Sequence, residues 1–94
     1  MADHGTRIRT WIRGTADDER AGLLGYLSLF HGDLVIDGVT VRRTAAGKLT
    51  LSFPERRDRH GRAHSVVRPV DDAARRAFEA AVFGEATLTR EVEP

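Results

Sequence analysis

Apolar and polar residues alternate along much of the chain between residues 7 and 70, the pattern of half-buried β-strands. In the first such stretch, 7–13, the alternation predicts one buried face and one face that carries the arginines. The predicted buried face consists of Ile8, Thr10 and Ile12, and Trp11 lies with the arginines on the other.

Four further strands are predicted downstream, at 23–30, 34–42, 48–53 and 64–70. The first and second strands are separated by the segment 14–22, which is polar and bounded by glycines, so we expect an exposed loop. The pair Asp37-Gly38 predicts a β-bulge or a short break in the third strand. Pro54, which has no backbone N–H, ends the fourth strand or confines it to an edge.

The pattern changes to a helical one after Pro69. The spacing predicts a helix over 71–83, begun by Asp71 or Asp72 as N-cap and ended by Gly84. One stripe of this helix is apolar and is expected to pack on the sheet, with Phe78 as its main anchor. The stripe consists of Ala74, Ala77, Phe78, Ala81 and Val82.

Consecutive strands joined by short turns favour an antiparallel meander. The predicted fold is therefore α+β, with a small antiparallel sheet of about five strands and one C-terminal helix packed on it. Residues 1–94 form a single domain, with the strands within 7–70, the helix at 71–83 and a tail at 85–94 that frays.

Composition narrows the class of protein. The chain has 94 residues, 40% of them apolar, which is enough for one small core. It has no cysteine, which excludes disulfides, thiolate nucleophiles and cysteine-built metal sites. Its N-terminus has no apolar run resembling a signal peptide, so we expect a cytoplasmic protein.

The formal net charge of +1 hides a strongly basic centre. Residues 42–68 hold eight arginines and lysines but only two acidic residues, whereas both flanking segments are net negative. Such a distribution indicates a local anion-binding surface rather than a globally basic protein.

An ordered set of motifs runs through this centre: Pro54-x-Arg56-Arg57, then a turn glycine at Gly61, then Arg68-Pro69-Val70. A helix that carries Arg75 and ends in Ala81-Val82 follows. With this set, the stretch 34–82 resembles the septation protein SpoVG family of bacteria. The chain departs from the family pattern at Glu55, where a small polar residue is usual, and at Arg68, where a histidine is usual.

The resemblance implies a small regulatory protein that binds nucleic acid, DNA or RNA, through its phosphates. It also implies a homodimer formed by pairing of sheet edges, with links to septation, sporulation and the control of gene expression. Carried over by position, the residues expected to touch nucleic acid are Arg56, Arg57 and Arg75. By charge alone, Arg59, Arg62 and Arg76 are added to them.

Other interpretations stay open. The arginines are also consistent with a solvated hairpin that protects the sheet from aggregation. A second functional class is a protein-interaction module that acts through sheet edges or apolar faces without nucleic acid.

Chemistry other than binding has little support in the sequence. The grouping of His60, His64 and Asp58 lacks the helical spacing typical of metal ligands, so we expect no metal and no cofactor. We also expect no enzyme activity, no small-molecule substrate and no membrane binding, because the residues form no catalytic constellation or free amphipathic helix.

Overall fold

The computed structural model describes residues 5–85 and Leu88. Its elements follow the order β1 (Thr6–Arg13), α1 (Ala16–Arg20), β2 (Leu23–His31), β3 (Leu34–Arg43), β4 (Leu49–Ser52), β5 (Glu55–Arg57), β6 (Ala63–Ser65) and α2 (Asp72–Phe83).

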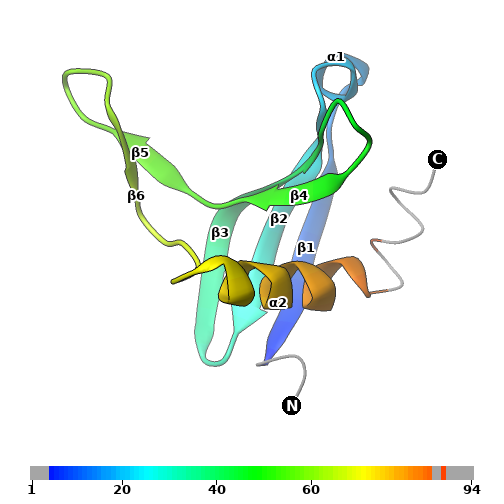
Figure 1. Cartoon of the computed structure of the whole chain (residues 1–94), viewed down its shortest axis with the longest axis vertical. Coiled ribbons are helices and arrows are strands. Elements are labelled where there is room, and N and C mark those ends of the chain that lie inside the picture. The colour runs from blue at the N-terminus through cyan, green and yellow to red at the C-terminus, as the bar shows by residue number, and fades with distance from the viewer. Residues whose placement is uncertain (1–4, 86–87, 89–94) are drawn as a thin grey trace.

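The first four strands form one antiparallel sheet in the order β1-β2-β3-β4, so β1 and β4 are its edges. Helix α2 crosses one face of this sheet (Figure 1). Between them lies the core, which consists of Leu27, Leu29, Ile36, Val39, Val41, Leu51, Val82 and Leu88. The predicted α+β class, a small antiparallel sheet with one C-terminal helix, is confirmed. We call this sheet with α2 the body.

The predicted faces of the first strand are wrong beyond Ile8. Ile8 pairs with Leu29 and Thr10 with Ser28, so β1 contains one extra residue at Arg9, a bulge. Because side chains alternate with a period of two, the extra residue exchanges the faces. Trp11 therefore packs against the core, and Ile12 is 62% exposed.

Of the bulge or short break predicted at Asp37-Gly38, the structure contains the bulge. Leu29 pairs with Ile36 but Leu27 pairs with Val39, which leaves one extra residue in β3. Gly38 lies there with φ of 81°, a conformation that side chains disfavour.

The segment 14–22 is not a loop throughout, because it contains the short helix α1. Thr15 caps it: its hydroxyl accepts from the Asp18 N–H at 3.1 Å, and the Asp18 carboxylate accepts from the Thr15 N–H at 2.9 Å. This reciprocal pair is a capping box with Asp in place of the usual Glu. Thr15 followed three residues later by an acid is the signal that predicts it.

The fifth strand of the predicted meander also differs. Only Ala63–Ser65 is a strand, and it pairs with β5 to form a separate two-stranded sheet. Beyond it, Val66, Val67 and Val70 are exposed rather than half-buried. The reason lies at Pro54: the chain leaves β4 before it, and β5 then begins a new ladder away from the sheet.

The predicted helix is confirmed with its caps. The Asp71 carboxylate accepts from the Ala74 N–H at 2.8 Å, and Gly84 ends the helix. Phe78 packs edge-on against Phe53 with 5.5 Å between ring centroids, but the deepest helix residue is Val82. The expected fraying at 85–94 does not hold at Leu88, which is fully buried; residues 86–87 and 89–94 lie outside the described residues.

Candidate nucleic-acid interface

The strands β5 and β6 with their connecting turn, residues 55–65, form what we call the basic ribbon. Its pairs are Glu55 with Ser65, Arg56 with His64 and Arg57 with Ala63. All six of these residues are exposed. In Figure 1 the ribbon extends away from the sheet, which agrees with the exposure of its strand residues.

Asp58 organises the turn of the ribbon. Its carboxylate accepts from the N–H groups of His60 at 2.8 Å and Arg62 at 3.0 Å, and it lies 2.8 Å from the His64 ring nitrogen Nε2. These hydrogen bonds, that of His64 first, hold the pKa of Asp58 below its ordinary value. One of the two acids of the ribbon is therefore occupied inside the turn.

The four arginines of the ribbon fall into two kinds. Arg57 donates to the Gly61 carbonyl at 2.7 Å, and the Arg62 guanidinium lies 3.7 Å from the Asp58 carboxylate. Arg56 and Arg59 are exposed and have no partner among the described residues. These two guanidiniums keep all their donors for a ligand, and the other two keep part of theirs.

The two predicted helix arginines lie elsewhere. Arg75 reaches over the edge of the sheet, where its Nη1 donates to the Leu51 carbonyl at 2.7 Å and lies 3.4 Å from the Glu79 carboxylate. Its guanidinium also stands 5.8 Å from the centre of the Phe53 ring. Arg76 is exposed on the next position of α2. Four of the six predicted residues are thus brought together, and Arg75 serves the body.

Arg75 and Glu79 together occupy the free edge of β4. The Glu79 carboxylate accepts from the Leu51 N–H at 3.2 Å while Arg75 donates to the Leu51 carbonyl. At Leu51, both backbone groups that a neighbouring strand would bind are therefore satisfied by one helix. On the other edge, the Glu85 carboxylate accepts from the Ile8 N–H at 2.6 Å.

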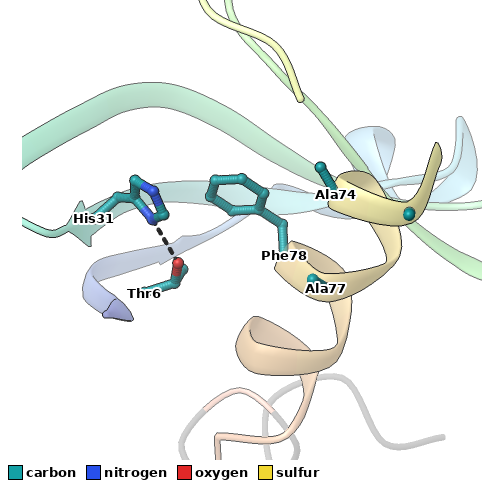
Figure 2. A pocket seen from close by; sticks show the side chains of 6 residues that line it. Thr6, His31, Ala74, Ala77 and Phe78 are labelled. Atoms are coloured by element: carbon teal, nitrogen blue, oxygen red, sulfur yellow. Dashed lines mark hydrogen bonds between the residues drawn. The ribbon is translucent and has the colours of Figure 1, made fainter. Parts of the chain in front are cut away.

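A second feature, which the sequence did not predict, is an apolar pocket of about 380 Å³ beside α2. Figure 2 shows the rings of His31 and Phe78 side by side in its lining, with Thr6 below His31. The two ring centroids are 4.8 Å apart, and Thr6 Oγ1 lies 2.7 Å from His31 Nδ1. Its lining suits an apolar group rather than a phosphate. No sequence signal marks it, because its residues come from β1, β2 and α2.

Within residues 5–85 and 88, no group of three or more His, Asp or Glu side chains is placed to hold a metal ion. The same residues contain no helix with the length and apolar character needed to cross a membrane.

Comparison of the chain with protein-family models, with curated proteins and with solved structures gives no match. The interpretation of the site therefore depends on the geometry of its own residues and on the motif resemblance.

Proposed function

We propose that this is a nucleic-acid-binding regulatory protein of the SpoVG type, which contacts phosphates through the basic ribbon. It acts in the cytoplasm by binding rather than by catalysis. The observation that carries the proposal is the pair Arg56 and Arg59, two exposed guanidiniums without an acidic partner on a protruding ribbon. Arginines presented in this way neutralise phosphates and release counterions.

The arrangement of the ribbon supports phosphate contacts over base contacts by these arginines. Arg56 lies in a strand and Arg59 in the turn, so the two charges are spread along the ribbon rather than gathered at one point. Contacts of this kind position a backbone and carry little sequence information.

The test is binding to a labelled 20-base-pair duplex and to a single-stranded RNA across a salt series. The variant is Arg56→Ala plus Arg59→Ala, because Arg57 and Arg62 also hold the turn. We expect the slope of log affinity against log salt to become shallower by about 2 units on duplex, one for each lost phosphate contact.

A matched control removes two exposed arginines from elsewhere, Arg9→Ala plus Arg20→Ala, with the same change in net charge. Its salt slope should stay at the wild-type value. Equal losses in both variants would show a diffuse charge effect and contradict a ribbon site. No binding by the wild type at low salt would leave the protein-interaction alternative, for which Val66, Val67 and Val70 are the exposed apolar candidates.

The proposal includes a homodimer. Because Arg75 and Glu79 satisfy Leu51 on the β4 edge, we place the pairing at the open edges of the ribbon, beside the exposed Val66 and Val67. Light scattering across a concentration series tests this: Val66→Ser plus Val67→Ser should shift the protein to monomer, whereas an unchanged mass would contradict it.

A further inference from the structure

A groove of about 470 Å³ lies where the edge strand β4 meets the base of the basic ribbon. Residues from three parts of the chain line it, including Thr40, Arg42, Ser52, Phe53, Glu55 and Arg75. Its volume falls within the range of small-molecule binding sites, about 300–1,000 Å³. The groove is therefore large enough to enclose one small ligand or one unit of a larger one.

One wall of the groove is rich in hydrogen-bond donors. Thr40 and Ser52 are directly opposite in the β3–β4 ladder, so their hydroxyls lie on the same face. Arg42 follows Thr40 by two residues and therefore shares that face. It is exposed and has no partner in the described part of the chain. Arg42 is thus a free cation beside two hydroxyls, which is a setting suited to a phosphate.

Glu55 adds a carboxylate to the groove, opposite in charge to Arg42. An ionised carboxylate only accepts hydrogen bonds and repels phosphate, so it needs a donor from the ligand. Among the pyrimidine bases, cytosine carries an exocyclic amino group that is such a donor, whereas thymine and uracil have a carbonyl oxygen in its place and only the N3–H to donate. Glu55 is also the first residue of β5, directly before Arg56, so the groove continues into the basic ribbon.

We propose that the groove binds one nucleotide of a single-stranded nucleic acid, with Arg42 on its phosphate and Glu55 accepting from an amino group of its base. This inference rests on the proposed function, since the ribbon holds the rest of the same strand. A single strand is required because the groove encloses one nucleotide, and unpaired bases can turn their edges into such a site. The groove supplies a base preference that the ribbon arginines do not.

The experiment measures binding of labelled oligo(dC) and oligo(dT) of eight nucleotides by fluorescence anisotropy at neutral pH. We expect the wild type to bind oligo(dC) about fivefold more tightly than oligo(dT). Glu55→Ala should bring this ratio close to one. The control Asp33→Ala removes one exposed acid from the β2–β3 turn and should keep the wild-type ratio.

Arg42→Ala tests the phosphate contact separately. It should weaken binding of both oligomers equally and lower the salt slope by about 0.7, the value for one phosphate of a single strand. Thermal unfolding of each variant shows whether it remains folded, and Glu55 and Arg42 are both exposed, so we expect unchanged transitions.

These variants distinguish failure of the groove proposal from failure of the proposed function. One outcome is that Arg56→Ala plus Arg59→Ala loses binding while Glu55→Ala keeps the wild-type ratio of oligo(dC) to oligo(dT) affinity. This outcome overturns the groove proposal and leaves the ribbon proposal intact. Tighter binding of duplex than of either single strand also overturns it. If the wild type binds neither oligomer nor duplex, the groove and the proposed function fall together.

Discussion

The body and the basic ribbon are held together by different forces. In the body, β2, β3, β4 and α2 all contribute fully buried apolar side chains, and two side chains of α2 bind the β4 edge at Leu51. In the ribbon, all six strand residues are exposed, and order comes from Asp58, from the ladder and from the Val66 N–H donating to the Pro54 carbonyl at 3.0 Å. An isolated two-stranded hairpin is only marginally stable in water.

Mutations in the two regions should therefore have different effects. Changes in the body should alter the free energy of unfolding, because they remove buried contacts. Changes in the ribbon should alter local order and ligand binding while leaving global unfolding almost untouched. Stability and function are thereby separated along the chain, and each of the following variants tests that separation.

The largest effect is expected in the core. Leu29 is fully buried beneath α2, so Leu29→Ala should lower the free energy of unfolding by about 2–5 kcal/mol, through lost transfer energy and the cavity left behind. Urea unfolding followed by circular dichroism measures it. His60→Ala, in the exposed turn of the ribbon, is the comparison and should stay within about 0.5 kcal/mol of wild type. A similar loss in both would contradict the separation.

The next effect is expected at the sheet edge. Arg75→Ala leaves the Leu51 carbonyl without its donor and should cost about 1–3 kcal/mol in urea unfolding. Its neighbour Arg76→Ala, with the same change in charge, should cost less than about 0.5 kcal/mol because Arg76 is exposed. If Arg75 serves only nucleic acid, its variant will keep full stability and lose affinity instead.

Arg75 also shows how much of the structure could be predicted from the sequence. The helix and its caps were predictable because each cap acts over three or four residues at its own end: Asp71 accepts from Ala74, and Gly84 donates to Ala80. The position of the Arg75 side chain was not, because its partner Leu51 lies 24 residues away and meets it only in the folded chain. The charge cluster of the candidate site was visible in the sequence, whereas its division between ribbon and body was not.

The first strand shows the same limit of sequence-based prediction for the fold. Its existence followed from alternation, but the bulge at Arg9 depends on how β1 pairs with β2. One extra residue was enough to exchange Trp11 and Ile12 between core and solvent. Local patterns therefore predict elements well, and pairing partners decide which face is buried.

A matched pair of glycines tests whether the two regions unfold separately, and its expected effect is smaller. Gly38 in β3 and Gly61 in the ribbon turn have nearly the same φ, 81° and 80°. A side chain in this left-handed region costs about 1–2 kcal/mol at either position. At Gly38 a new Cβ would also stand 3.3 Å from the Pro54 Cβ, whereas at Gly61 nothing lies within 4 Å.

Gly38→Ala should therefore lower global stability by about 1–2 kcal/mol in urea unfolding. Gly61→Ala should leave the urea midpoint unchanged within error and instead speed hydrogen exchange of the ribbon amides. A lowered midpoint in Gly61→Ala would mean that the ribbon unfolds together with the body, and the two regions would then be one cooperative unit.

The smallest effect on global stability is expected from Asp58, which orders only the ribbon turn. Because its folded pKa lies below the ordinary 3.8, its contribution is fully present above that value and is lost as pH falls through the folded pKa. The amide signals of His60 and Arg62, which donate to this carboxylate, should report the transition in an NMR pH titration. Its midpoint should lie below 3.8, while the amides of the core residues Leu29 and Val41 stay unchanged.

Asp58→Ala should remove this titration and leave the ribbon turn disordered at every pH, with urea unfolding unaltered. Asp58→Asn keeps one acceptor oxygen without the charge, so it should keep part of the turn order and show no titration. A midpoint at or above 3.8 in the wild type would contradict the hydrogen bonds that lower the pKa. Movement of the body amides with the same midpoint would show instead that the turn is coupled to the core, and that the ribbon is not independent of it.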